Sequence, residues 1–467
     1  MRTLIENRFA LVLLVVVAMA ALFGVAEATR PAESAPAEQP ATVEAAVESA
    51  LRVCPVPEDG DTRVAAFTPP AETGDAPSLF AATALDGTES EIGTIGGPGQ
   101  GFDAAADTEE LVMRAEGPVA AGLTAVQTTT ASGDLLSAPC APPGLGFWYL
   151  APGAGEVDDL DLHLVNVDDT PTRVHIDVYA AEGALQTLEG DTVEIEPHGR
   201  TVQSLNEISE SAPVVAVHVR TTTGRVASGL LAADGSGSDW VPASGELATD
   251  VVIPGLPDGS GERLLAVASP GDSATVRISA IAEDGTFVPE DQEELEVPAG
   301  ALATANLSGV LTDRAAAIRL SSDTPIAAGV LATGGGDRAF TAPVPPVTGT
   351  AVVPGNRSGD GFEQELLLAA PEGAAQVEVV PTGPDGAAGE PQRVEVPAGG
   401  LLPVEPAAPT GAESGFAALV RVLEGSSPIY VARVQRNDGG MTILPVPPAP
   451  VTVTLPHTSD TLTTVVE

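Results

Sequence analysis

The sequence predicts an all-β protein, in which tandem immunoglobulin-like β-sandwich repeats follow one N-terminal transmembrane helix. Three observations lead to this prediction. Sequence landmarks recur about every 100 residues, short runs of Val, Leu, Ile and Thr alternate with Gly, Pro, Asp and Ser, and one unbroken apolar run lies near the N-terminus. Repetition at a fixed period is the signature of a repeat architecture. Short apolar runs between turn residues are typical of β-strands.

The landmarks appear in the same order in each repeat. A Pro-Gly pair comes first, then a strand that ends in a Pro-x-Gly turn, then two strands joined by a turn. The Pro-Gly pairs at Pro152, Pro254 and Pro354 are 102 and 100 residues apart. A degenerate copy lies upstream, because RVAAFTPP, which contains Arg63, precedes RLLAVASP, which contains Arg263, by 200 residues.

These landmarks divide the chain into seven segments. We predict a signal anchor or signal peptide at 1–28, an Ala/Pro/Glu linker at 29–50, a degenerate β-unit closed by a disulfide at 51–145, β-sandwich units at 146–247, 248–348 and 349–450, and a C-terminal strand or tail at 451–467. Within 41–53, the absence of Pro and Gly and the abundance of Ala and Glu predict a short helix.

The best-preserved repeat predicts seven strands. They are expected at 263–268, 274–282, 292–297, 301–307, 315–320, 325–332 and 338–344. Seven short strands in about 100 residues fit an immunoglobulin-like sandwich. The alternative is a β-propeller with two blades per period, because one blade takes about 40–50 residues.

The apolar run at 9–26 is long enough to cross a bilayer as a helix. Arg2 and Arg8 precede it, which predicts that the N-terminus stays in the cytoplasm. We therefore expect a single-pass protein of the cell membrane with its bulk outside the cytoplasm. The sequence Ala26-Glu27-Ala28 also resembles a signal-peptide cleavage site, so secretion after cleavage at Ala28 is the alternative.

The charge of the chain excludes a nucleic-acid partner. The sequence has 65 acidic residues and 20 basic residues, all of them arginine, and a formal net charge of −45 at pH 7. Such a chain is repelled by nucleic acids and by anionic surfaces. The two cysteines, Cys54 and Cys140, are 86 residues apart. In an exported chain an even pair predicts a disulfide, which here would bracket the degenerate first repeat.

Four histidines of one repeat are the first candidates for a metal site. His163, His175 and His218 lie in predicted strands, and His198 lies in the Pro-x-Gly turn. Imidazoles gathered in one domain are able to bind a metal, but the following repeat has other residues at the aligned positions. We interpret the histidines as ordinary solvent-facing residues and predict no metal ligand.

The other polar motifs do not predict a calcium site or a catalytic site either. The acidic clusters Asp158-Asp159-Asp161 and Asp234–Asp239 lack the spacing of a calcium-binding loop. Gly271-Asp272-Ser273 lies in a strand-to-strand turn and has no partner histidine in its repeat. We therefore predict no catalytic residue and no cofactor.

The densest aromatic group in this aromatic-poor chain is GLGFWYLAPG, which contains Trp148 and Tyr149. Trp240 marks a later edge of the same repeat. The first interpretation is a plug in the core between the first two repeats. The second is an exposed recognition patch, since aromatic side chains concentrate binding energy at interfaces.

The order of these motifs resembles a known family. Cys54-Pro55, Cys140 followed by FWYLAPG, and tandem VPAG and PIAAG strands behind one membrane segment are similar to an actinobacterial family of exported or membrane-anchored proteins, which carries only a domain-of-unknown-function number, 5719. The resemblance covers roughly residues 50–450. It implies a cell-envelope location and supplies no catalytic residues.

The sequence therefore predicts a non-enzymatic cell-envelope protein that presents a row of β-sandwiches outside the membrane for structural or binding work. The expected partners are an envelope protein or a glycan, together with the membrane through residues 9–26. The alternative is a carbohydrate-active or hydrolytic enzyme with a cleft between repeats. The sequence shows neither a pair of carboxylates close to aromatic residues nor a nucleophile with its base and orienting partner, so it does not support that alternative.

Overall fold

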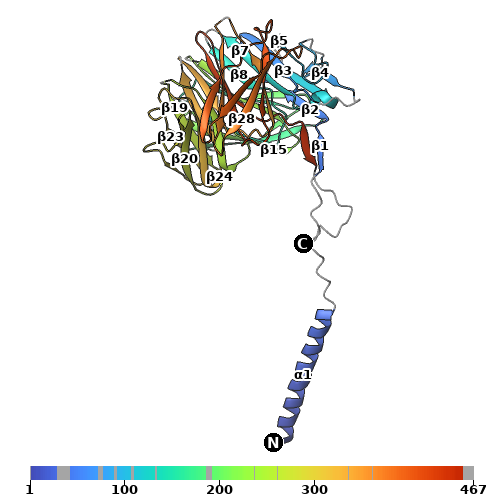
Figure 1. Cartoon of the computed structure of the whole chain (residues 1–467). Coiled ribbons are helices and arrows are strands. Elements are labelled where there is room, and N and C mark those ends of the chain that lie inside the picture. Colours follow the sequence, from blue (N-terminus) through green and yellow to red (C-terminus); the bar gives the residue numbers. More distant parts are fainter. Residues whose placement is uncertain are drawn as a thin grey trace. The chain divides into compact units, whose positions relative to one another are not determined.

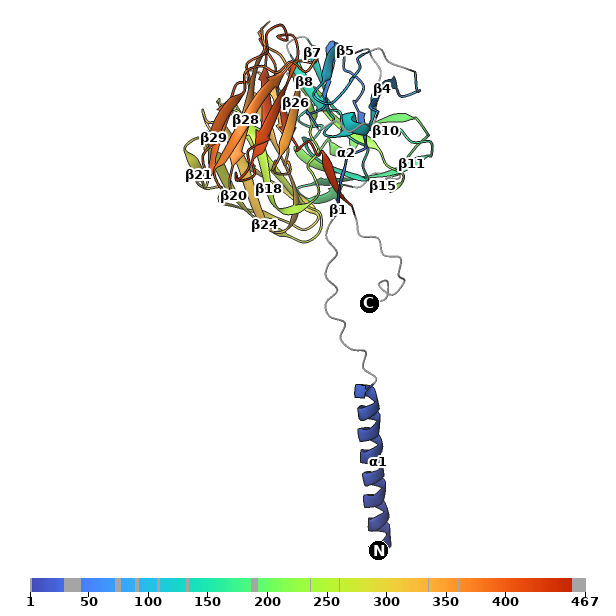
Figure 2. The same cartoon turned by 45° about the vertical axis from the view of Figure 1, so that its right-hand side comes forward.

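Outside its N-terminal helix, the described part of the protein consists almost entirely of β-strands (Figure 1). The computed structural model describes residues 2–28, 43–71, 77–88, 92–106, 110–131, 134–185, 192–235, 237–259, 261–334, 336–359 and 361–455. Residues Ala46–Thr452 form one compact unit that contains nearly all of the strands (Figure 2). The repeats therefore form a single body.

The N-terminal helix α1 spans Arg2–Ala28, and the apolar side chains described for it, within 12–25, are exposed. Among the helices that the structure describes, none is both long and apolar enough to cross a membrane. Anchoring through residues 9–26 stays a prediction. Most of the predicted linker, from residue 29 to 42, and the tail from 456 onward lie outside the described residues.

Two strands replace the short helix that was predicted at 41–53. Strand β1 (Val43–Ala46) pairs with β34 (Thr452–Leu455), and β2 (Ser49–Val53) pairs with β6 (Leu111–Glu116). Ala and Glu favour a helix by only a few tenths of a kcal/mol per residue. Pairing with strands that lie far away in the sequence outweighs that preference.

Four successive repeats make up the compact unit. The first comprises β2, β3 (Asp61–Phe67), β4 (Leu79–Ala84), β5 (Gly101–Ala105), β6, the 3-10 helix η1 (Gly117–Ala120), β7 (Thr124–Ala131) and β8 (Asp134–Pro139). The second comprises β9 (Gly146–Pro152), β10 (Asp159–Val165), β11 (Thr172–Ala180), β12 (Gly183–Leu185), β13 (Thr192–Ile195), β14 (Arg200–Ser204), α2 (Asn206–Ser209), β15 (Val214–Thr223), β16 (Ala227–Asp234) and β17 (Gly237–Val241).

The third and fourth repeats follow the same plan. The third comprises β18 (Ala248–Leu256), β19 (Arg263–Ser269), β20 (Ala274–Ala282), β21 (Gly285–Phe287), β22 (Glu294–Val297), β23 (Ala301–Asn306), β24 (Ala316–Gly334) and β25 (Asp337–Thr341). The fourth comprises β26 (Thr350–Asn356), β27 (Glu363–Ala370), β28 (Ala375–Thr382), β29 (Gln392–Val396), β30 (Gly400–Val404), β31 (Phe416–Val422), β32 (Tyr430–Arg436) and β33 (Met441–Val446).

Each repeat forms two antiparallel sheets, and the strand order is shared between repeats. One sheet has the order β5-β3-β7-β8 in the first repeat, β14-β10-β16-β17 in the second, β23-β19-β24-β25 in the third and β30-β27-β32-β33 in the fourth. In the third repeat the strands predicted at 315–320 and 325–332 are one continuous strand, β24, which belongs to both sheets.

Alternating side chains give each sheet one buried face. In β11, Val174, Ile176 and Val178 are buried, whereas His175 and Asp177 between them are only half-buried. They share a hydrophobic core with residues of the facing sheet such as Leu162. This period of two is what a half-buried strand requires.

A propeller does not describe these repeats. A propeller blade is a single sheet of four strands, whereas here the chain passes back and forth between the two sheets of each repeat. The strand patterns of the sequence therefore predicted the all-β class, and the long-range pairings exclude the propeller alternative.

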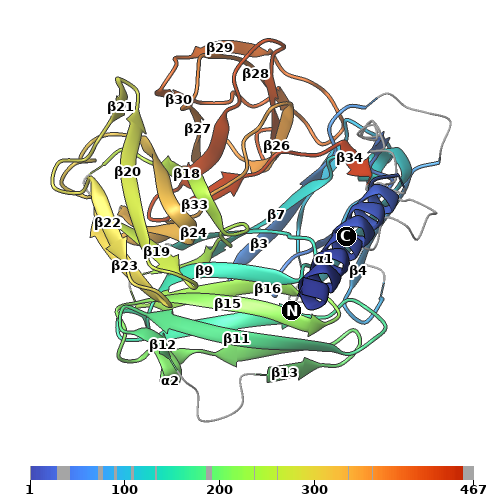
Figure 3. The ribbon, with the colours of Figure 1, turned by 90° about the horizontal axis from the view of Figure 1, so that it is seen from below.

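Successive repeats pack against each other through small apolar side chains. Trp148 and Ala216 of the second repeat contact Ala266 and Ala327 of the third. The fourth repeat packs against the first as well as the third, as in the contact of Val352 with the β3 strand. Viewed from below, the sheets that carry β11, β20 and β28 lie at the periphery (Figure 3). Alanine at these contacts lets the sheets approach closely despite the scarcity of aromatic residues.

Cys54 and Cys140 form a disulfide that joins the start of the first repeat to its end. Both cysteines are buried, at 0% and 3% exposure, in the core of that repeat. The bond closes a loop of 86 residues. A crosslink over this length restricts the unfolded chain considerably.

We predict that the double variant Cys54→Ala, Cys140→Ala is about 4 kcal/mol less stable than the wild type, because the unfolded chain regains the freedom of a long loop. Guanidinium denaturation without reductant measures this difference. Wild-type protein in reductant serves as the control and should approach the variant. A variant within about 1 kcal/mol of oxidised wild type would contradict the expectation.

Candidate functional site

Four strands, one from each repeat, meet at one place. Strand β17 packs against β8 and β25, and β33 packs against the same two strands. A Cβ atom on Gly237 would lie 2.3 Å from Oδ1 of Asp337, and a Cβ atom on Gly440 would lie 2.5 Å from the backbone nitrogen of Leu135. Only glycine permits these approaches, so the turns that lead into β17 and β33 position the meeting of the four strands.

Two buried carboxylates tie these strands together. Asp239 accepts hydrogen bonds from the backbone N–H of Ser137 at 3.0 Å and from the hydroxyl of Thr442 at 2.9 Å, so it joins β17 to β8 and β33. Asp337 accepts a hydrogen bond from the backbone N–H of Met441 at 2.8 Å, which joins β25 to β33. Each carboxylate therefore supplies an acceptor to donors of another repeat.

Burial shifts the pKa of both carboxyl groups upward. Burial raises the pKa of Asp239 well above its usual value, and backbone N–H donors partly oppose the rise. Burial also raises the pKa of Asp337 to about 6, again against hydrogen bonds from backbone N–H groups. A low-dielectric setting disfavours the charged form of a carboxyl group.

A buried arginine completes this polar cluster. Arg433 is 0% exposed and donates to the carbonyl oxygen of Pro354 at 2.8 Å and to the hydroxyl of Ser137 at 3.0 Å. Burial lowers the pKa of Arg433 to about 10, and the charges of Asp103 and Asp239 partly oppose that change. Ser137 connects the two charges, since its hydroxyl accepts from Arg433 and its N–H donates to Asp239.

A polar hollow of about 690 Å³ opens beside the starts of β25 and β33. We call it the Arg/Asp depression. Its charged lining residues are Glu156, Asp258, Glu262, Arg263, Asp337, Arg338, Arg436 and Asp438. They come from the second, third and fourth repeats, mostly from glycine-containing turns between strands. The size is that of a small-molecule binding pocket.

Two arginines at the depression are held by carboxylates. Arg436 of the fourth repeat contacts Asp258 of the third at 3.2 Å. Arg338 of the third repeat forms an ion pair with Asp234 of the second. Their side chains are 31% and 23% exposed, so both guanidinium groups remain partly accessible. The depression therefore offers hydrogen-bond donors whose directions are fixed by pairs between repeats.

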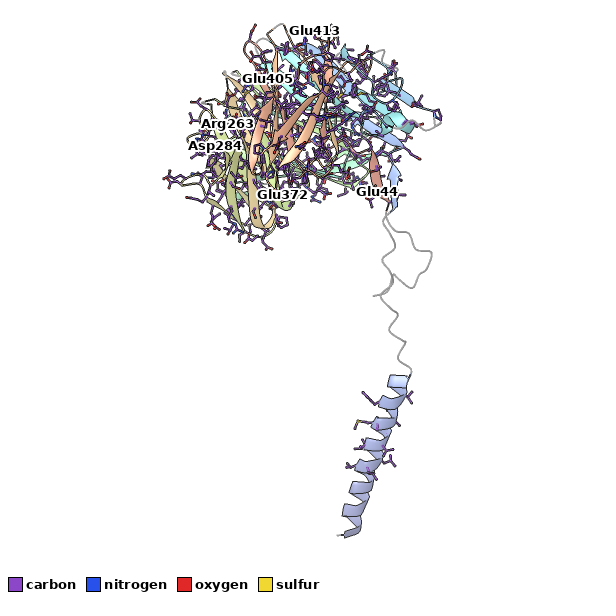
Figure 4. All side chains as sticks on the ribbon, viewed as in Figure 1. Glu44, Arg263, Asp284, Glu372, Glu405 and Glu413 are labelled. Carbon is purple, nitrogen blue, oxygen red and sulfur yellow. A yellow bond between two sulfur atoms is a disulfide. The ribbon has the colours of Figure 1, made fainter. Side chains whose placement is uncertain are left out.

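The third arginine lies below the surface. Arg263, labelled in Figure 4, is 2% exposed and donates to the carbonyl oxygens of Thr333 at 2.8 Å and Pro257 at 3.2 Å. Burial, followed by the charge of Arg436, lowers the pKa of Arg263, and Asp258 opposes this. Its role is to hold the loop before β19 against the end of β24.

The comparison with protein families identifies the chain's relatives. The model of the Family of unknown function (DUF5719) matches residues 101–407. The chain belongs to this family. The match confirms the resemblance seen in the sequence, while the actinobacterial source and export stay predictions. No curated protein matches the chain.

The matched part contains much of the site. It includes Asp239 and Asp337 and two of the arginines at the depression, Arg263 and Arg338, whereas Arg436 lies beyond it. The family description supplies no activity. Function must therefore be argued from the site itself.

The aromatic residues proposed as a recognition patch are buried. Trp148, Tyr149 and Trp240 are 6%, 1% and 4% exposed, which excludes an exposed patch. Trp148 stacks on His218 with ring centroids 4.0 Å apart, and it packs between the second and third repeats. The sequence shows that side chains of a strand alternate between its two faces. It does not show which of these faces is covered by a neighbouring repeat, so the burial of Trp148 could not be predicted.

The histidines do not converge. His163 lies on β10 of one sheet, whereas His175 and His218 lie on β11 and β15 of the other. His198 contacts Asp169 at 2.8 Å. Among the described residues, no group of three or more His, Cys, Asp or Glu side chains is arranged to hold a metal ion.

The ends of the acidic cluster Asp234–Asp239 have structural roles. Asp234 forms the ion pair with Arg338, and Asp239 is the buried acceptor at the meeting of the four strands. Asp272 contributes a backbone carbonyl that accepts from the hydroxyl of Ser269, within the turn between β19 and β20. The expected strand-to-strand turn is present there.

Sequence reasoning missed Asp337, Arg436 and Asp438. A weak signal for Asp337 and Asp438 does exist, because each repeat has an aspartate within three residues of the start of its last strand, next to a glycine-containing turn. These turns are SGDLL, DGSGSDW, GGGDRAF and NDGGMTI, with Asp134, Asp239, Asp337 and Asp438. The four aspartates do not occupy one aligned position, and their nearness became meaningful only when the four last strands were found together.

We predict that Asp337→Asn flattens the pH dependence of stability between pH 4 and 7. The folded pKa of Asp337, about 6, exceeds the usual value of 3.8. Its stabilising contribution is therefore complete below pH 3.8 and is lost as the pH rises through about 6. The wild type should lose about 1–2 kcal/mol relative to the variant over this range in denaturant unfolding.

The matched control is Glu424→Gln, at an exposed turn residue of the fourth repeat. It should keep the wild-type pH profile. Parallel profiles for wild type and Asp337→Asn would show that Asp337 does not bind its proton more tightly in the folded state.

Proposed function

We propose that this protein is a non-enzymatic binding protein of the cell envelope and holds a hydroxyl-rich ligand, such as a glycan, in the Arg/Asp depression. The observation that carries the proposal is the hollow of about 690 Å³, to which turns of three repeats contribute charged side chains. A rigid body of packed repeats presents these turns. Sites assembled from loops on a rigid scaffold are typical of binding proteins.

The charges of the depression favour a polyol over an anion. Five carboxylates and three guanidinium groups line it. A hydroxyl group both donates and accepts a hydrogen bond, so it matches a lining that offers both kinds of group. A phosphate-bearing ligand would face more carboxylates than arginines. The exposed carboxylate of Asp438 and the guanidinium of Arg436 are suitable neighbours for vicinal hydroxyls.

A hydrolytic enzyme is the second candidate, because a carboxyl group with a raised pKa lines the depression. Asp337, with a pKa of about 6, would be the general acid. Its oxygens accept hydrogen bonds from the backbone N–H groups of Arg338 and Met441, and its side chain is 2% exposed. This environment supports a structural role for the group and favours binding without hydrolysis.

We predict that the wild type binds members of a printed array of bacterial glycans. Arg436→Gln and Asp438→Asn should each weaken binding of the strongest glycan at least about 10-fold, since each removes charged hydrogen bonds worth roughly 1.5–3 kcal/mol. Calorimetric titration measures the affinity.

The control for this experiment is Arg393→Gln, which breaks an exposed ion pair with Glu378 on the outer sheet of the same repeat. It should bind as the wild type does. Depression variants with unchanged affinity would refute the assigned site, and release of shorter sugars that Asp337→Asn abolishes would favour the enzyme.

We also propose that the β-rich body lies outside the cytoplasm, held by the segment at 9–26. The buried disulfide between Cys54 and Cys140 supports an oxidising compartment. Membrane fractionation and N-terminal sequencing should find the intact chain in the membrane. A mature protein that begins at Thr29 and occurs in the medium would instead show cleavage after Ala28.

A further inference from the structure

A second hollow lies between the first and second repeats, beside the disulfide. Its volume is about 70 Å³. We call it the Tyr149 cavity. The first repeat contributes residues such as Cys54 and Ala138, and the second contributes Tyr149, His163, Ser228 and Trp240. Most of its wall is apolar, so the few polar atoms within it define what it can hold.

Three polar atoms of the lining residues are buried without a hydrogen-bond partner in the described structure. They are the hydroxyl of Tyr149, the hydroxyl of Ser228 and Nδ1 of His163. Burial raises the pKa of Tyr149, and a hydrogen-bonding contact with the Ser228 hydroxyl opposes this rise, so the two hydroxyls have at most each other as partners and keep unused hydrogen-bonding capacity. Buried polar groups in folded proteins are almost always paired. The unused capacity of the two hydroxyls, together with Nδ1 of His163, is what an occupant of the cavity would pair with.

The register of the strands explains how these groups reach the cavity. Ser228 is opposite Leu164 in the pairing of β16 with β10, on the face that shares the core with Tyr149. His163 is opposite Gly229, on the other face of the sheet. Pairing of β16 with β17 begins only at Leu230, so the preceding residues of β16 form a free edge. The cavity lies at this edge and is lined by residues from both faces.

The lining favours an uncharged occupant. It contains no Asp, Glu, Lys or Arg residue. Burial lowers the pKa of His163, which keeps its ring neutral at neutral pH. A charged ligand would lose its hydration without gaining a counter-charge. The indole of Trp240 meets the ring of His163 edge-on at 5.1 Å between centroids, and this pair provides a flat apolar wall.

We propose that the Tyr149 cavity is a binding site for a small uncharged molecule with one hydrogen-bonding head and a short apolar body. The volume corresponds to about two liquid-water volumes of roughly 30 Å³ each. A hydroxyl or amide head on roughly three carbons fits that space. The head bonds the hydroxyls of Tyr149 and Ser228, and the body lies against Trp240.

The test uses 1-propanol as the probe and the two tryptophans as reporters. The sequence has only Trp148 and Trp240, and only Trp240 lines the cavity. In full-length protein labelled with 5-fluorotryptophan, ¹⁹F NMR should give two signals, which Trp240→Phe assigns. Titration with 1-propanol should shift the Trp240 signal until it saturates and leave the Trp148 signal in place.

Two variants test the hydrogen-bonding head. Tyr149→Phe and Ser228→Ala should each weaken the apparent affinity about 5-fold, as expected for one hydrogen bond. The matched control, Tyr179→Phe, removes the hydroxyl of a tyrosine that contacts Trp148 outside the cavity, and should keep the wild-type affinity. Because two variants are tested, a folding defect in one of them leaves the other to test the proposal.

The proposal is overturned if the Trp240 signal moves linearly with 1-propanol or if both signals move alike, because the cavity then holds water only. It is also overturned if neither variant changes the affinity. Saturable movement of Trp240 that both variants weaken supports the site. Glycan binding in the Arg/Asp depression is measured separately and does not affect these outcomes.

Discussion

The constraint on which the structure depends is the hydrogen bonding of buried polar side chains at the meeting of four strands. Asp239 and Arg433 are 0% exposed, in a chain whose other buried residues are mostly Val, Leu, Ile and Ala. A polar group that loses its hydration on burial must be compensated by hydrogen bonds within the protein. Here the partners belong to different repeats, so the repeats must assemble together for these bonds to form. The polar cluster therefore specifies one arrangement of four similar sandwiches.

This specificity matters because apolar contacts are non-directional, so those between the repeats do not by themselves fix how the repeats are arranged. The faces that meet are rich in alanine and valine. The carboxyl group of Asp239 needs both the N–H of Ser137 and the hydroxyl of Thr442, and far fewer arrangements of the repeats provide both donors. The cluster thus selects the arrangement, and apolar burial supplies most of the stabilisation.

The same turns that bring the strands together also create the surface of the Arg/Asp depression. Glycine at positions such as Gly440 allows close approach, and the neighbouring Arg436 and Asp438 then face the hollow. The turn before the last strand of a repeat therefore both positions that strand and supplies side chains to the candidate site. Repeats with a common framework thereby carry different side chains at the same turn, and the site has no internal symmetry. The high negative charge of the chain makes the few accessible arginines distinctive donors.

The sequence by itself determined the repeat period, the all-β class and the pairing of its two cysteines, because these depend on local alternation, turn residues and composition. It did not determine that β24 is continuous, that residues 43–53 form strands, or that Trp148 and Trp240 are buried. It also could not unite Asp239 with Thr442, which is 203 residues away. Such contacts depend on which sheet faces cover one another. That choice is made by long-range pairing and by the need to satisfy buried polar groups, and only the tertiary structure decides it.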